Sequence, residues 1–280
     1  MLRGLHHVTA LAGDPLANLD FYTNFAGLRL IKRTVNFDDP ATYHFYFAPE
    51  PEPGRIATFF PWPSAPAGRD GSGRIRALAF AVPQNTIDAA AAEQRFSEPL
   101  ITTRDPAGLA VERVALAVPT VRLHSVTLAV ADPDRTGRFL TDLLGFRFLA
   151  NEGDRGRFEL AGSFADVIAM PGDRAKLGPG MVHHVAWRAS GDEELNQWRE
   201  KLKSAGVHVT RVIDRKYFRS IYFREPGGVL FEIATEEPGF LIDEPAGRLG
   251  RSLQLPPWLE PLRESIERRL PPLKWSADLK

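Results

Sequence analysis

Cysteine is absent from the 280-residue sequence. Disulfide bonds and thiolate metal sites are therefore excluded, and any metal ion would be held by His, Asp or Glu. Long apolar runs are also absent, since no stretch approaches the roughly 20 residues that a membrane-spanning helix needs. The first residues, Met1–Gly4, lead directly into an alternating segment without the apolar core of a signal peptide. We therefore expect a soluble, cytoplasmic protein.

An excess of either charge is missing too, because 35 basic residues balance 35 acidic ones. No Lys/Arg-rich run is present, which argues against a nucleic acid as a partner. Hydrophobic residues make up 44% of the chain and charged residues 25%, which is typical of a soluble globular protein. The length allows one large domain or two smaller ones, each with a core of its own.

An internal repeat organises the chain. The segment Leu5–Thr9 aligns with Leu123–Thr127 at an offset of 118 residues, and the same register places Asp14-Pro15 on Asp132-Pro133. In both copies a short alternating strand leads into the Asp-Pro pair, which is typical of the N-cap and first residue of a helix. A duplicated strand–helix unit followed by further strands is therefore expected.

Two further units have the same outline. One runs from Ile75 to Glu112 with a helix expected at residues 87–96, and the other runs from Val182 to Glu232 with a helix at 193–204. Each contains a Pro-x-Gly turn before its last strand. We therefore predict an α+β fold of four βαβββ modules, which form two pseudo-symmetric half-barrel domains, plus a C-terminal helical tail.

The predicted boundaries follow the repeat. Residues 1–118 would form the first domain with modules 1 and 2, residues 119–238 the second with modules 3 and 4, and residues 239–280 a tail that packs on the body. The Pro- and Gly-rich stretch 49–73 predicts a loop between the first two modules. In the tail, the Leu-Pro-Pro-Trp motif at 255–258 opens a predicted helix that Pro271-Pro272 ends near Leu270.

Three metal donors are predicted on separate strands. Successive side chains of a strand face opposite sides, so His7 and His184 are expected to face a cavity. The same alternation places His6 and His183 on the opposite face. Glu232, on the final strand, adds a carboxylate. Two imidazoles and one carboxylate make a facial triad, which suits Fe(II) or Mn(II) and leaves three coordination positions open.

The repeat predicts one metal ion per chain. Ser125 stands at the position of His7 in the third module, and Ala77 stands at the position of His184 in the second. Only Glu112 keeps the acid that corresponds to Glu232, so the complete set lies across modules 1 and 4. Three other histidines are interpreted as relics or non-ligands: His44, His124 and His208.

Seven segments between Leu5 and Pro272, taken together, are specific to one protein family. They are 5–9, 32–37, 181–186, 214–218, 220–228, 231–235 and the Leu-Pro-Pro-Trp tail. Together they resemble the vicinal oxygen chelate (glyoxalase/bleomycin resistance/extradiol dioxygenase) superfamily. Within it the chain is most similar to hydroquinone-cleaving ring dioxygenases. The resemblance covers nearly the whole chain.

The resemblance implies that the second His of each pair, His7 and His184, binds Fe(II) together with Glu232, with Mn(II) as the alternative metal. It also implies that five residues orient an aromatic diol and move its protons: His6, Thr9, His183, Arg215 and Tyr222. The implied reaction is an O2-dependent ring cleavage in aromatic compound catabolism. Its substrate would be a 1,4-diol such as a substituted hydroquinone, with a catechol as the alternative, and a homo-oligomer is compatible with the sequence.

Two other functions stay open on the same fold. A glyoxalase-like lyase or isomerase typically needs a fourth protein ligand, and Ser125 offers no imidazole for it. A metal-free small-molecule binding protein would have no reason to keep three convergent donors. Oxygen consumption separates the dioxygenase from the lyase, and metal content separates both from the binding protein.

Overall fold

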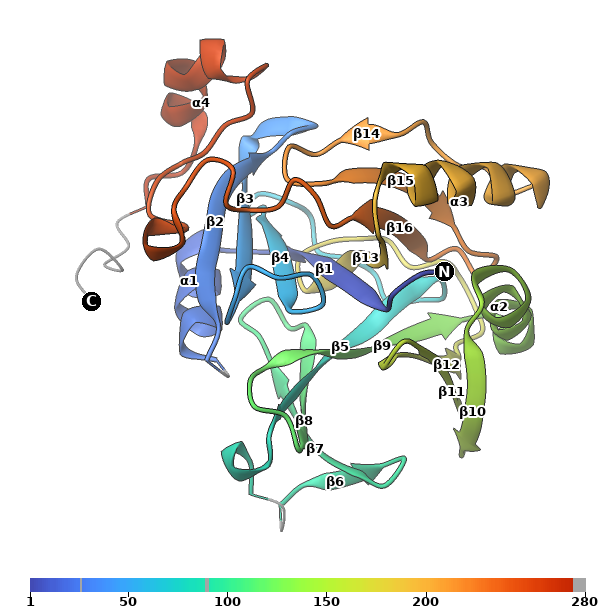
Figure 1. Ribbon diagram of the computed structural model, residues 1–280. Helices are drawn as coiled ribbons and strands as arrows, with labels where there is room; N and C mark the ends of the chain where they lie inside the picture. The colour runs from blue at the N-terminus through green and yellow to red at the C-terminus, as the bar shows by residue number, and fades with distance from the viewer. Residues whose placement is uncertain (26, 89–90, 274–280) are drawn as a thin grey trace.

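The computed structural model describes residues 1–25, 27–88 and 91–273, and its strands form two curled eight-stranded sheets (Figure 1). In spatial order the first sheet contains β14 (Ile213–Asp214), β15 (Arg219–Arg224), β16 (Leu230–Thr235), β13 (Met181–Ala189), β1 (Leu5–Ala12), β4 (Ile56–Pro61), β3 (Asp39–Ala48) and β2 (Arg29–Asn36). The second contains β10 (Arg147–Glu152), β11 (Arg155–Leu160), β12 (Ser163–Ala169), β9 (Arg122–Val130), β5 (Arg74–Pro83), β8 (Ala110–Leu116), β7 (Glu98–Arg104) and β6 (Glu93–Arg95).

Each sheet takes one module from each half of the chain. β1 pairs antiparallel with β13 and so joins modules 1 and 4, whereas β5 pairs antiparallel with β9 and joins modules 2 and 3. The predicted α+β fold with two pseudo-symmetric half-barrels is thereby confirmed. The predicted division at residue 118 groups the modules by sequence order; strand pairing does not test that division, and it stays a prediction.

The helices lie around the periphery of the two sheets, with α4 near the C-terminal end of the chain (Figure 1). They are α1 (Pro15–Asn24), α2 (Pro133–Arg138) with a π-helical continuation (Phe139–Leu144), α3 (Asp192–Ser204), α4 (Arg263–Arg269) and three 3₁₀ turns (Gln84–Thr86, Ala246–Arg248, Glu260–Leu262). The two Asp-Pro pairs act as predicted, because Asp14 accepts a hydrogen bond from the Ala17 amide at 2.8 Å and Asp132 accepts one from the Arg135 amide at 2.9 Å.

Three local predictions are wrong. Residues 87–96 do not form a helix: a 3₁₀ turn precedes them, β6 occupies 93–95, and residues 89–90 lie outside the described part. β6 pairs with β7, and this pairing overrides the helix propensity of the Ala-rich segment. The stretch 49–73 is not only a loop, since it contains β4, which pairs parallel with β1. The tail helix begins later than Leu255, at Arg263 after a 3₁₀ turn.

One apolar cluster reaches through both sheets. Val8 of β1, Leu78 of β5, Val126 of β9 and Val185 of β13 are all fully buried in it. Each such side chain contributes about 1.5–3 kcal/mol through its removal from water. The inner strands of both sheets are therefore firmly held, and residues on them have fixed positions. Within the described ranges, none of the helices is both long and apolar enough to cross a membrane.

Two β-bulges interrupt the pairing of β1 with β13. Register shifts in this ladder leave His6 on β1 and His183 on β13 without an opposite partner residue. A bulge adds one unpaired residue to a strand and changes the direction of its side chain. Strict alternation between the two faces therefore fails at these two histidines.

Candidate metal centre

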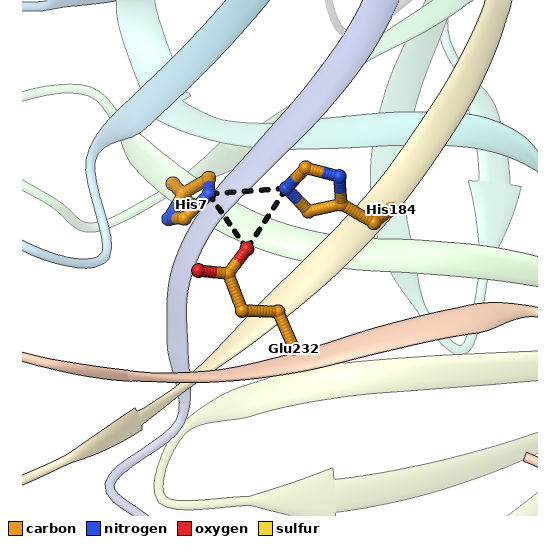
Figure 2. Close-up of side chains that lie close together, drawn as sticks. All are labelled: His7, His184 and Glu232. Carbon is orange, nitrogen blue, oxygen red and sulfur yellow. Dashed lines mark hydrogen bonds and ion pairs between the residues drawn. The ribbon is translucent and has the colours of Figure 1, made fainter. Parts of the chain in front are cut away.

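Three side chains converge at the centre of the first sheet: His7 from β1, His184 from β13 and Glu232 from β16 (Figure 2). Glu232 Oε2 lies 2.9 Å from His184 Nε2 and 3.3 Å from His7 Nε2, and the two Nε2 atoms are 3.3 Å apart. All three residues are buried. Within the described part of the chain, no other group of three or more His, Cys, Asp or Glu could hold a metal ion.

The charges of the three residues suit a cation. Burial favours the neutral acid form of Glu232, but the neighbouring His7 and His184 outweigh burial and hold its pKa well below 4.5. Burial lowers the pKa of His184, and Glu232 reverses this only in part. The result is one carboxylate beside an imidazole that favours its neutral, metal-binding form.

The two carboxylate oxygens of Glu232 have different surroundings. Oε1 accepts a hydrogen bond from Ser220 Oγ, whereas Oε2 is buried and, within the described residues, lies against the Nε2 atoms of His7 and His184 without a hydrogen bond. A buried carboxylate oxygen without a hydrogen bond costs free energy. A divalent cation between Oε2 and the two Nε2 atoms would supply the missing partner, and this donor set matches the preference of Fe(II) and Mn(II). The residues therefore fit a metal ion.

His6 fixes the orientation of His7. His6 Nε2 lies 3.0 Å from the Thr235 carbonyl oxygen, which can only accept, so Nε2 carries the hydrogen. Burial, together with His7, lowers the pKa of His6 to about 3, so this ring is neutral and its Nδ1 has a free lone pair. His7 Nδ1, at 2.8 Å, must then be the donor. In the neutral form of His7, the form that binds a metal, Nε2 then carries no hydrogen and directs its lone pair at the centre.

His183 holds His184 in a matching way. The two Nδ1 atoms lie 2.7 Å apart, and burial, together with His184, lowers the pKa of His183 to about 3. The expectation that His6 and His183 face away from the donors is therefore wrong. The bulges in β1 and β13 turn each first histidine back toward its neighbour.

A cavity of about 600 Å³ opens in front of the three donors. Its apolar wall includes Phe37, Phe60, Trp62, Leu177, Phe218 and Leu230. His7, His184 and His183 reach its surface, and so do Thr9, Arg215 and Tyr222. Of the predicted site residues, only His6 and Glu232 are not part of this surface: they lie directly behind it, in contact with His7.

Arg215 connects two rims of the cavity. Its Nε donates to the Tyr222 hydroxyl oxygen at 3.0 Å, and its Nη1 pairs with Asp38 Oδ2 at 2.9 Å. Asp38 belongs to the turn between β2 and β3, at the other end of the same sheet. Burial lowers the pKa of Arg215, but Tyr222 and Asp38 outweigh it and raise the pKa. The guanidinium therefore stays charged at the cavity mouth.

The sequence reasoning missed one residue of the cavity wall, His44, and its buried hydrogen-bond partner, Thr58. His44 was interpreted as a non-ligand; it is outside the donor cluster, but it lines the cavity. Its Nε2 lies 2.8 Å from Thr58 Oγ1, and Thr58 Oγ1 donates to Thr9 Oγ1 at 2.8 Å. Thr58 lies on β4, the strand inside the predicted loop. The alternation of Thr42, His44 and Tyr46 along β3 was the available signal for His44, because all three line one cavity.

Comparisons with known proteins identify relatives of this chain. A sequence profile of the Glyoxalase/Bleomycin resistance protein/Dioxygenase superfamily matches residues 122–233. MhqO of Bacillus subtilis (strain 168), named provisionally as a ring-cleaving dioxygenase, is 40% identical over 97% of this chain and 96% of its own. The chlorohydroquinone/hydroquinone 1,2-dioxygenase of Sphingobium indicum is 29% identical over 96% of both chains. A crystal structure of a provisionally named dioxygenase from Bacillus subtilis superposes with a TM-score of 0.92 at 39% identity, covering 98% of both chains.

The fold and the three donors together define a class of protein. In this class, paired βαβββ modules form a shared sheet that presents two imidazoles and one carboxylate to a cavity. The relatives then make the assignment particular. The chain belongs to the glyoxalase/bleomycin resistance protein/dioxygenase superfamily, among relatives named as ring-cleaving dioxygenases.

Proposed function

We propose that this protein is a non-haem, Fe(II)-dependent ring-cleaving dioxygenase of the extradiol type, which acts on hydroquinone-type diols with O2. The observation that carries the proposal is the buried convergence of His7, His184 and Glu232 on a largely apolar cavity. Such a triad leaves coordination positions open and is typical of non-haem Fe(II) oxygenases. The names of the relatives support the same reaction. Mn(II) is the alternative metal.

The cavity suits a small aromatic substrate. Its volume of about 600 Å³ lies within the range of small-molecule sites. Aromatic side chains line it, and most of its exposed surface is apolar. An apolar ring can therefore be removed from water here while its hydroxyl groups meet specific partners.

Iron(II) bound by the triad would supply the redox chemistry by which O2 reacts with the diol. Tyr222 would donate a hydrogen bond to a substrate oxygen, because its oxygen accepts from Arg215 and its hydroxyl hydrogen is not used in that contact. Burial, together with Glu232, raises the pKa of Tyr222, so its hydroxyl keeps the proton. The charge of Arg215 would hold the deprotonated diol. His183 would accept a proton, since its ring is neutral and reaches the cavity surface.

The further roles belong to the same proposal. His6 would orient His7, and Thr9 would contact the substrate from the floor of the cavity. A cytoplasmic location, a homo-oligomeric state and a role in aromatic compound catabolism are proposed with them.

A glyoxalase-like lyase or isomerase is the second candidate, and one position argues against it. Thr9 pairs with Thr58 in β4 as Ala186 pairs with Glu232 in β16, so Thr58 is the counterpart of Glu232 in the first module. A hydroxyl group that is hydrogen-bonded to Thr9 replaces the second carboxylate. The fourth protein ligand that lyase chemistry typically needs is therefore missing at this position.

Oxygen uptake tests the proposed function. The protein is loaded anaerobically with Fe(II), and oxygen consumption is recorded on addition of methylhydroquinone and, separately, of catechol. We expect uptake with methylhydroquinone that is lost in His184→Ala and Glu232→Ala. The matched control is Glu112→Ala, at the corresponding position of the second sheet, which should retain uptake. Bound metal without uptake on either diol would contradict the proposal and favour the lyase or isomerase.

A further inference from the structure

His44 lies on the cavity wall between two aromatic rings. Its ring centroid is 4.1 Å from that of Tyr46 and 4.2 Å from that of Phe60, so the ring plane is held by packing. The residue is half-buried, and it belongs to the cavity lining. A phenylalanine would pack in the same way. The packing alone therefore does not explain why an imidazole stands here.

The hydrogen bonds of His44 determine which of its nitrogens is free. Thr58 Oγ1 donates to Thr9 Oγ1, so the hydrogen between His44 and Thr58 must come from His44 Nε2. In the neutral ring Nδ1 then carries a lone pair. Among the described residues Nδ1 has no hydrogen-bond partner, and it is not one of the buried unpaired atoms. It is therefore an acceptor that the cavity can reach.

The surroundings keep this ring neutral. Burial is the main cause that holds the pKa of His44 well below 6.5, and His7, His184 and Arg215 lower it further. Glu232 acts in the opposite direction and is outweighed. The lone pair on Nδ1 is thus available throughout the neutral pH range.

His44 and the Arg215–Tyr222 pair stand on different parts of the curled first sheet. His44 is on β3, on one side of the central strands β1 and β13, whereas Tyr222 is on β15, on the other side. The His7–His184–Glu232 centre lies on the strands between them. A 1,4-diol carries its two hydroxyl groups at opposite ends of the ring, while a catechol carries both at one end. A cavity with polar groups at the donor centre and at a separate wall matches the first arrangement.

We propose that His44 Nδ1 accepts a hydrogen bond from the diol hydroxyl that is not held at the His7–His184–Glu232 centre, and that this contact selects 1,4-diols. The inference rests on the proposed function, since it names the substrate oxygen that His44 meets. His44 is a specificity-determining residue in this account. Thr58 is a positioning residue, because its hydrogen bonds to His44 and Thr9 fix the ring with Nδ1 toward the cavity.

Binding measurements test the inference without relying on turnover. Anaerobic calorimetry on the Mn(II)-loaded protein compares hydroquinone with 4-methoxyphenol, which has the same ring but cannot donate from the second oxygen. We expect the wild type to bind hydroquinone about tenfold more tightly, the size of one hydrogen bond. In His44→Phe this preference should fall to within about twofold, with catechol binding unchanged.

Two variants make the result decisive. His44→Asn places a side-chain carbonyl near the position of Nδ1 and should recover part of the preference for hydroquinone. His208→Phe makes the same substitution at an exposed histidine outside this cavity and should leave all three affinities unchanged. A preference that persists undiminished in His44→Phe overturns the inference. Absence of oxygen uptake in the wild type, with the binding preference intact, would instead contradict only the proposed ring cleavage.

Discussion

The same seam between two modules occurs twice in this chain, between β1 and β13 and between β5 and β9. Both seams contain bulges at matching places, since register shifts leave His6 and His183 unpaired in the first and Arg76 and His124 unpaired in the second. The backbone is therefore nearly the same at both seams. Within the described residues, only the first seam presents a set of metal donors, so the side chains decide what each seam can bind.

The matching acids of the two sheets have different partners. Glu112 of β8 pairs with Arg95 Nη1 at 2.7 Å. Arg215 is the counterpart of Arg95 in the first sheet, because each stands seven positions before the residue that pairs with the acid, Thr102 opposite Glu112 and Tyr222 opposite Glu232. Arg215 is held by Asp38 and Tyr222 instead. Among the described residues Glu232 therefore has no guanidinium partner, and its Oε2 faces the imidazoles of His184 and His7.

In the second sheet, ion pairs occupy the positions that correspond to the cavity of the first sheet. Asp166 is the counterpart of Thr58, and it pairs with Arg157 at 2.8 Å and with Arg155 at 3.5 Å. Arg155 is the counterpart of His44 and donates to Thr127 at 2.8 Å. The comparison of the two sheets shows that the same position in the fold can form a metal centre or a cluster of salt bridges. Which of the two forms depends on the residues with which the nearby arginines pair.

The largest expected effect separates the two acids. Glu232→Gln should weaken Mn(II) binding at least about 100-fold, because it removes the only charged donor of the centre. Glu112→Gln, the same change in the second sheet, should leave the affinity unchanged. Equilibrium dialysis against Mn(II) measures both. Equal losses in the two variants would mean that the second sheet contributes to the metal site.

A second expected effect concerns stability. Asp166→Asn should lower the free energy of unfolding by about 2–3 kcal/mol, since it removes the charge-assisted hydrogen bonds to the buried Arg157, which keeps Glu98 as a partner. Thr58→Val, at the corresponding position of the first sheet, should cost only about 1 kcal/mol, because it removes hydroxyl hydrogen bonds and no charge partner. Urea unfolding of the metal-free proteins gives both values. A cost for Thr58→Val as large as that for Asp166→Asn would remove the energetic distinction between the sheets.

The smallest expected effect is a pH dependence of the second sheet. Burial raises the pKa of Glu98, but His124 and Arg157 outweigh it, and the net shift is downward from 4.5. A lowered carboxyl pKa stabilises the folded protein above 4.5 and loses this contribution as the pH falls through the lowered value. Glu98→Gln should therefore lose less stability than the wild type between neutral pH and a pH below 4.5. Parallel losses in urea unfolding at the two pH values would show that Glu98 contributes nothing to acid sensitivity.

Much of the fold and part of the site could be predicted from the sequence. Asp14-Pro15 and Asp132-Pro133 mark helix starts through local capping, which depends on neighbouring residues only. The internal repeat made His7, His184 and Glu232 predictable as metal donors, because the sequence shows both their side-chain types and their places on the predicted strands. These local signals are also what made the four modules predictable.

The rest depends on pairing between distant segments. The bulges at His6 and His183 come from the register of β1 against β13, which strand alternation cannot reveal. β4 lies in a Pro- and Gly-rich stretch, and it forms a strand because β1 and β3 bind it on both sides. The role of His44 follows from Thr58 on that strand. The contact of Arg215 with Asp38 joins residues 177 positions apart.

The position of a bound metal tests the central claim most directly. Crystals of the wild-type protein grown with Mn(II) would give an anomalous difference map that locates every ordered metal ion. We predict one strong peak per chain, bounded by His7 Nε2, His184 Nε2 and Glu232 Oε2, and no peak beside Glu112 and Ser125. A peak at the second seam, or none at the first, would contradict the account.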